Sequence, residues 1–182
     1  MISEFIDAYS DDQIYLDMLE RLVASHPNEA AVPDSIKYSS FSRLWSVMMV
    51  GGIECMIQEW ARDDSAMHDI YAYFDSGSNA ERIERLQSAL NVRGIEPKIT
   101  LFEDLLAVKY IRNAYVHGKW NVKQREYVVN RGFPRTLMLF EASHFERMKL
   151  SYLHVMQCLG MAKAFNTLLA RRSDASQETP PK

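Results

Sequence analysis

Residues 100–118 read TLFEDLLAVKYIRNAYVHG, and this stretch decides the fold class. Its apolar side chains recur at the i, i+4, i+7 spacing of one helix face, at Leu101, Leu105, Val108 and Ile111. Thr100 and Glu103 have the spacing of a capping box, and Gly118 is a natural helix stop. The stretch therefore predicts one amphipathic helix whose last turns carry the polar residues of the sequence RNAYVH.

The sequence on either side repeats this helical pattern. Further helices are predicted over about 10–25, 39–60, 63–74, 80–92 and 143–170. The second of these crosses Gly51-Gly52, where we expect another backbone to pack closely. Two short β-rich runs, 127–129 and 137–140, predict a small hairpin-like insert before the last helix. The predicted fold is all-α: an up-and-down helical bundle with long central helices and this one insert.

The length of 182 residues suits one domain, which we assign to residues 1–170, followed by a disordered polar tail, 171–182. The N-terminus lacks the basic start of a secretory signal, and the longest uncharged stretch is too short to span a bilayer. Cys55 and Cys158 lie in apolar helical sequence, so we interpret both as core thiols. These features predict a cytoplasmic protein without a membrane partner, and no spacing indicates a metal site or a cofactor.

Charge is divided unevenly along the chain. Residues 1–20 carry six acids and no base, whereas residues 112–135 carry six bases and one acid, a local net charge of +5 (6 − 1). Basic runs of this kind are usually solvated faces. This run also contains His117, so a second interpretation is that it binds an anionic partner such as RNA.

Three polar side chains gather at the end of the predicted motif helix. Asn113 and His117 lie about 40° apart on one face, whereas Arg112 is about 140° from His117. Histidine suits proton transfer near neutral pH, and a guanidinium matches phosphate. Asn113 could hold the ribose, a phosphate oxygen or the histidine tautomer. These groups suit RNA cleavage without a metal, because the ribose 2′-OH is itself the nucleophile. The alternative is that Arg112 and His117 are ordinary cations at a helix C-terminus, where the helix dipole favours them.

Glu54 is the only charged residue between Leu44 and Gln58, on a helix predicted to be largely buried. A lone carboxylate in such a place requires a cation or several hydrogen-bond donors. Arg112 is one candidate cation, and the ion pair would orient its guanidinium. The alternatives are a purely structural ion pair and a partly hydrated carboxylate.

Residues 111–118, Ile-Arg-Asn-Ala-Tyr-Val-His-Gly, resemble the signature of the HEPN superfamily, a group of helical domains that includes prokaryotic toxins and phage-defence ribonucleases. In that family an Arg is followed after four to six residues by a His, near the end of the third core helix. Glu54 matches a Glu that recurs in an earlier core helix of several branches. The likeness covers roughly residues 40–170 of this chain.

The resemblance implies a metal-independent endoribonuclease in a toxin or defence role, with Arg112, Asn113 and His117 in the active site and Glu54 in support. It also implies RNA as substrate, a homodimer with two motifs in one cleft, and an antitoxin or operon partner protein. One toxin branch has a Tyr that its antitoxin modifies where this chain has Lys119, so we do not expect regulation of that kind. The alternative is a non-catalytic HEPN-like module that binds nucleic acid, nucleotide or a partner protein.

Further RNA-binding residues are assigned outside the family motif. Trp120 and Tyr127 are flanked by bases and are candidates for stacking on nucleobases. On charge alone, the residues assigned to the RNA backbone are Lys119, Lys123, Arg125, Arg131 and Arg135.

Overall fold

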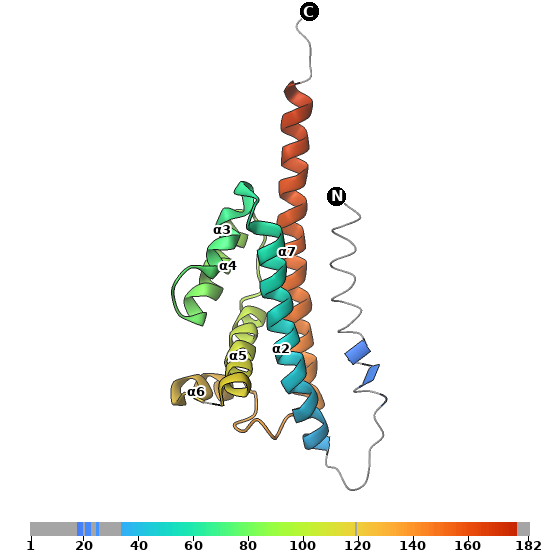
Figure 1. Cartoon of the computed structure of the whole chain (residues 1–182), viewed down its shortest axis with the longest axis vertical. Coiled ribbons are helices and arrows are strands. Elements are labelled where there is room, and N and C mark those ends of the chain that lie inside the picture. The colour runs from blue at the N-terminus through green and yellow to red at the C-terminus, as the bar shows by residue number, and fades with distance from the viewer. Residues whose placement is uncertain (1–17, 20, 23–24, 26–33, 119, 178–182) are drawn as a thin grey trace, which may run out of the picture. The chain divides into compact units, whose positions relative to one another are not determined.

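The computed structural model describes residues 18, 19, 21, 22, 25, 34–118 and 120–177 of the chain (Figure 1). Across these residues all regular structure is helical, and the fold is an all-α helical bundle, as predicted. Its elements are α2 (Asp34–Ala61), η1 (Ser65–Met67), α3 (His68–Tyr71), η2 (Ala72–Phe74), α4 (Asn79–Val92), α5 (Ile99–His117), α6 (Val122–Asn130) and α7 (Ala142–Gln177). The helix predicted over 10–25 falls almost wholly outside the described residues. No helix among those described is long and apolar enough to cross a bilayer.

The predicted hairpin-like insert is wrong, because its first half forms helix α6. Asn121 begins this helix by accepting a hydrogen bond from the backbone N–H of Lys123 (2.9 Å), and Gly132 follows its end with φ +79°. Val128 is fully buried within α6. Burial against the rest of the protein therefore outweighs the β-propensity of the Tyr-Val-Val run.

Several predicted boundaries also move. Helix α2 begins at Asp34, before the predicted start near residue 39, and Ser39 is buried, where its Oγ accepts from the N–H of Phe140 (3.1 Å). Helix α5 begins at Ile99, which places Thr100 inside the helix. Helix α7 continues to Gln177, so the predicted disordered tail is wrong for residues 171–177, and 178–182 lie outside the described residues.

The structure corrects two predictions about α2, one in part. A Cβ added to Gly51 would meet nothing within 4 Å, so the close backbone packing predicted for the Gly51-Gly52 pair is wrong for Gly51 and stays a prediction for Gly52. Cys55 is exposed, whereas Cys158 is buried as predicted.

The described residues form two compact units. The first contains the described residues up to Gly52 together with Glu103–Leu150, and the second contains Ile53–Phe102 together with the described residues from Ser151 onward. Helices α2, α5 and α7 each contribute residues to both units. The motif residues Arg112, Asn113 and His117 all belong to the first unit, and Glu54 belongs to the second.

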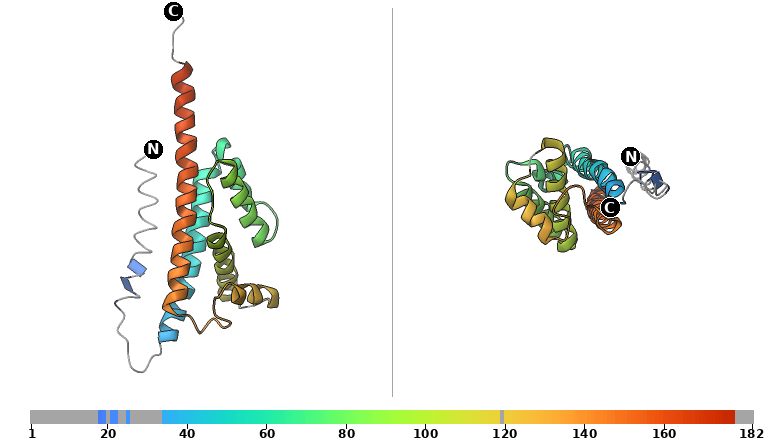
Figure 2. Two further views of the ribbon diagram at one scale, coloured as in Figure 1. Left: turned by 180° about the vertical axis from the view of Figure 1, so that it is seen from behind. Right: turned by 90° about the horizontal axis from the view of Figure 1, so that it is seen from below.

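In the first unit, the beginning of α2 and the beginning of α7 lie side by side (Figure 2). Trp45 of α2 packs on Phe145 of α7, with 4.9 Å between the ring centroids. Helix α6 leaves the end of α5 at a steep angle (Figure 1). The end of the motif helix is therefore followed at once by a second short helix.

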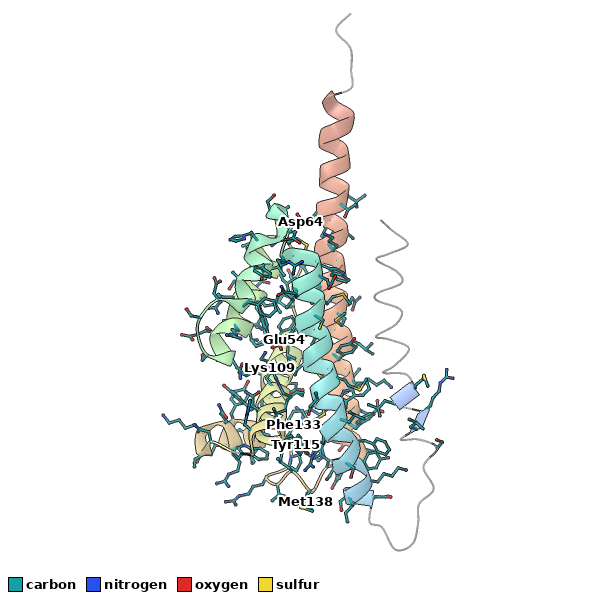
Figure 3. The ribbon with its side chains drawn as sticks, viewed as in Figure 1. Glu54, Asp64, Lys109, Tyr115, Phe133 and Met138 are labelled. Atoms are coloured by element: carbon teal, nitrogen blue, oxygen red, sulfur yellow. The ribbon has the colours of Figure 1, made fainter. Side chains whose placement is uncertain are left out.

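In the second unit, polar contacts join the short helices to α4 and the end of α2 to α7. Arg93, which caps α4, pairs with the carboxylate of Asp69 on α3, and this pairing lowers the pKa of Asp69. Lys163 of α7 donates to Asp64 (3.0 Å) and to the backbone oxygen of Trp60 (3.2 Å); Asp64 lies just beyond the end of α2 (Figure 3). Each contact joins segments that are far apart in the sequence.

Candidate functional site

The end of α5 and the beginning of α6 enclose an open cleft of about 590 Å³. Asn113 and His117 line it from α5, and Trp120, Asn121 and Gln124 line it from the segment that follows. All five residues belong to the first unit. Asn113 is half-buried and His117 is exposed, so the imidazole is open to solvent while the carboxamide lies deeper.

The cleft exists because the chain turns sharply after His117. Gly118 has φ +65°, and its N–H donates to the backbone oxygen of Ala114 (3.0 Å), which closes the last turn of α5. Asn121 then caps the N-terminus of α6, and Gln124 follows three residues later on the same side of that helix. The turn thus places the carboxamide of Gln124 beside the same cleft as His117.

Helix α6 is anchored to α5 by an ion-pair cluster. Asp104 of α5 is buried, with 6% of its side chain exposed, and its Oδ1 accepts from Arg131 (2.7 and 3.0 Å) and from Arg147 (2.7 Å). Arg131 also pairs with Glu103 (2.9 Å), and Arg147 lies over the ring of Phe133 at 4.5 Å. Two carboxylates and two guanidinium groups therefore balance in charge and hold the end of α6 in place.

Tyr127, a predicted stacking residue, belongs to this anchor. Its hydroxyl donates to the backbone oxygen of Glu103 (3.3 Å), and its ring meets Tyr110 edge-on with 5.7 Å between centroids. Burial raises the pKa of Tyr127 to about 12. Of the two predicted stacking residues, only Trp120 lines the cleft.

Tyr115, inside the motif, supports the neighbouring loop. Its hydroxyl donates to the backbone oxygen of Leu137 (3.0 Å), and the guanidinium of Arg43 lies over its ring at 4.7 Å. Burial raises the pKa of Tyr115 to about 12. Figure 3 labels Tyr115 near the end of α5 and Met138 in the loop that leads to α7. Helix α5 therefore lines the cleft with Asn113 and His117, and its Tyr115 side chain holds the loop that leads to α7.

The predicted catalytic residues are only partly brought together. Asn113 and His117 share the cleft, as their i, i+4 spacing predicts. Arg112 is half-buried and is not one of the residues that line the cleft. Glu54 is half-buried in the second unit, where it accepts a hydrogen bond from the hydroxyl of Tyr73 (3.1 Å). Its carboxylate therefore has a donor, and its pairing with Arg112 stays a prediction.

The predicted RNA-binding side chains differ in their surroundings. Arg131 is held by Asp104 and Glu103, so its charge is balanced within the protein, and a contact of Arg131 with RNA stays a prediction. Lys123 and Arg135 are exposed and Arg125 is half-buried. Lys119 lies outside the described residues. Lys123 and Arg125 lie on α6, and Arg135 lies in the loop that follows it.

Two cleft residues after the motif, Asn121 and Gln124, were not predicted from the sequence, and neither were two buried charges on α5, Asp104 and Lys109. Asn121 and Gln124 gave no signal, because no helix was predicted over the segment that contains them. Asp104 is buried in an apolar helix, and a buried carboxylate requires a cation or several hydrogen-bond donors, but the adjacent Glu103 hid this signal in the sequence. Lys109, one helical turn before Asn113, is fully buried, a place that lysine rarely takes (Figure 3).

Within the described ranges, no group of three or more His, Cys, Asp or Glu side chains is placed to hold a metal ion. Comparisons with protein-family models, with curated proteins and with solved structures found no match to this chain. The cleft and the residues that line it are therefore the features of this chain that indicate a function.

Proposed function

We propose that this chain is a metal-independent endoribonuclease that acts at the cleft beside His117. The observation that carries the proposal is the pairing of Asn113 and His117 at the wall of one open cleft. An imidazole and a carboxamide with access to solvent suit proton transfer to and from RNA and binding of its sugar-phosphate backbone. The resemblance of residues 111–118 to the HEPN signature supports the same assignment.

In the proposed reaction the ribose 2′-oxygen attacks the adjacent phosphorus, and the bond from phosphorus to the 5′-oxygen of the next nucleotide breaks. The products are a 2′,3′-cyclic phosphate and a free 5′-hydroxyl. His117 takes the proton from the 2′-OH or delivers one to the leaving 5′-oxygen. Asn113 donates to a phosphate oxygen, and Arg112 supplies positive charge from the preceding position of α5.

One cleavage event needs one proton removed and one proton delivered. A single cleft holds one copy of His117, so we propose that a second copy of the chain faces the same RNA and supplies the other imidazole. This homodimer, a cytoplasmic location, and restraint by an antitoxin or operon partner are further parts of the proposal. Two free cysteines, of which Cys55 is exposed, suit a reducing compartment.

The experiment compares the parent protein with His117→Ala on mixed single-stranded RNA in the presence of a chelator. We expect His117→Ala to lower the cleavage rate by roughly 10²- to 10⁴-fold, because proton transfer is lost. His68→Ala is the matched control, since His68 is an exposed histidine on α3 and is not among the residues that line the cleft. Equal cleavage by parent and His117→Ala, or no cleavage by either, would contradict the assignment.

The second candidate function is a non-catalytic module that binds nucleic acid, nucleotide or a partner protein. The observation that favours it is the position of Arg112, which is not among the cleft-lining residues. Such a module would bind RNA without cutting it, and its affinity would survive His117→Ala. Cleavage by the parent would exclude this alternative.

A further inference from the structure

We propose that the α6 side of the cleft is a nucleobase subsite, in which one unpaired base of single-stranded RNA stacks on Trp120 and is hydrogen-bonded by Asn121 and Gln124. This inference names the substrate class of the nuclease proposed above and rests on that function only for the cut itself. The binding it describes can be measured without any cleavage.

The lining of the cleft has the chemistry of base recognition. It contains three carboxamides, one imidazole and one indole, and none of the five residues is a Lys, Arg, Asp or Glu. Phosphate groups are bound chiefly by Arg and Lys, whereas Asn and Gln side chains pair with base edges that carry both donors and acceptors. A volume of about 590 Å³ lies within the range of small-ligand sites. The lining therefore suits a flat, uncharged, polar ring.

Helix α6 orients these groups. The Oδ1 of Asn121 accepts from the N–H of Lys123 (2.9 Å), so the amide nitrogen of Asn121 offers its two hydrogens elsewhere. Gln124 follows on the same side of the helix and carries both a donor and an acceptor. Asn121 is thus fixed as a hydrogen-bond donor, and Gln124 can form a hydrogen bond with either a donor or an acceptor on a base edge.

Trp120 supplies the stacking surface. Its indole nitrogen is buried and has no acceptor among the described residues, so the part of the side chain that is open consists of aromatic carbon. Aromatic carbon surfaces hold bases by stacking, whatever the base. Stacking requires an unpaired base, because the bases of an A-form duplex are stacked on each other.

The surrounding charges fit a strand that passes along the cleft. Lys123 and Arg125 flank Gln124 along α6, about 100° to either side of it. Their cations can follow the phosphates, while Gln124 and Asn121 contact the base. The strand would then carry the phosphate next to that base toward His117, which lines the same cleft from α5.

The test measures binding of fluorescently labelled 2′-O-methyl dodecamers by anisotropy. These strands lack the 2′-OH and cannot be cleaved by the proposed reaction. The set contains single strands of U, A or C, an abasic strand with the same number of phosphates, and a duplex. We expect single strands with bases to bind at least about 5-fold more tightly than the abasic strand or the duplex, given the contribution of one stacked base.

Variants identify the residues responsible. Trp120→Ala should weaken binding of base-containing strands by about 5- to 150-fold and leave the abasic strand unchanged, whereas Trp120→Phe should retain most of the affinity. Gln124→Leu should reduce the differences between U, A and C. Lys123→Ala should weaken all strands alike. Val129→Ala, an exposed position on the same helix, is the matched control.

Three results would overturn the proposal. They are equal affinity for base-containing and abasic strands, duplex binding as tight as single-strand binding, and a Trp120→Phe variant that folds normally by circular dichroism but has lost all affinity for bases. If free mononucleotides displaced the labelled strands at concentrations as low as those of the dodecamers, the ligand of this subsite would be a free nucleotide and not an RNA strand. If the parent does not cleave RNA but these binding differences hold, the subsite stands and the nuclease proposal fails.

Discussion

Asp104 shows how one buried carboxylate changes the function assigned to a distant arginine. By sequence, Arg131 belongs to a basic run next to a candidate catalytic histidine. In the structure, its guanidinium is held by Asp104 and Glu103, and only 24% of its side chain is exposed. The charge of Arg131 is therefore part of the fold, whereas that of Arg135 is exposed and remains available to a ligand.

A pair of substitutions separates the two arginines. Arg131→Ala should lower the free energy of unfolding by about 2 kcal/mol, because buried Asp104 loses two charge-assisted hydrogen bonds and keeps the one from Arg147. Arg135→Ala should change it by less than about 0.5 kcal/mol. Urea unfolding followed by circular dichroism measures both. Equal stability of the two variants would mean that the cluster around Asp104 does not anchor α6.

At the level of elements, the junction of α5 and α6 sets the form of the cleft. Gly118 ends α5 in the left-handed region, and Asn121 begins α6 three residues later. A Cβ on Gly118 would meet nothing within 4 Å, so only its backbone conformation restricts the residue type. This position therefore isolates the energy of the turn from the effects of packing.

Substitution of Gly118 tests that turn. Gly118→Ala should lower the free energy of unfolding by about 1 to 2 kcal/mol, since an alanine in the left-handed region is strained. Gly118→Asn should cost less, because asparagine tolerates this conformation. The measurement is the thermal midpoint of each variant, together with its affinity for the uncleavable RNA strands. Identical midpoints for the two variants would show that the turn is not held at positive φ in solution.

Across the whole molecule, each compact unit contains a histidine that is held in its neutral form. In the first unit, Nδ1 of His144 accepts from the N–H of Glu141 (3.0 Å), and in the second, Nε2 of His154 accepts from the N–H of Lys98 (2.8 Å). Burial lowers the pKa of His144, and burial together with the charge of Lys98 lowers the pKa of His154, below the ordinary 6.5. Protonation of either ring would remove an acceptor that the backbone uses.

The two histidines predict a loss of stability in acid. Above the ordinary pKa both rings are neutral in the folded and unfolded states, so their titration does not change the free energy of unfolding. As the pH falls below about 6.5, the unfolded chain takes up protons first, and the folded state loses stability until its own lowered pKa values are passed.

Urea unfolding at pH 7.5 and 5.5 checks this expectation. The free energy of unfolding should fall between the two values for the parent protein. This decrease in the free energy of unfolding should be smaller for His154→Gln, because glutamine does not titrate. It should be the same as in the parent protein for His68→Gln, a control at an exposed position. A His154→Gln variant with the same acid sensitivity as the parent would contradict the role of His154.

Local patterns in the sequence were enough to predict the helical class, the motif helix, its end at Gly118 and the common face of Asn113 and His117. Each of these depends on residues within one or two helical turns, where periodicity and backbone preference act directly. The residues after Gly118 were interpreted wrongly as a hairpin, because β-branched side chains favour strands when burial is not known.

Only the tertiary structure decided that α6 is a helix, that Asp104 holds Arg131, and that Trp120 and Gln124 line the same cleft as His117. These features depend on contacts between residues that are distant in the sequence. The energy of such contacts exceeds the local propensities from which a sequence is interpreted. The motif at the end of α5 could therefore be predicted from the sequence, whereas the cleft beside it depends on the tertiary structure.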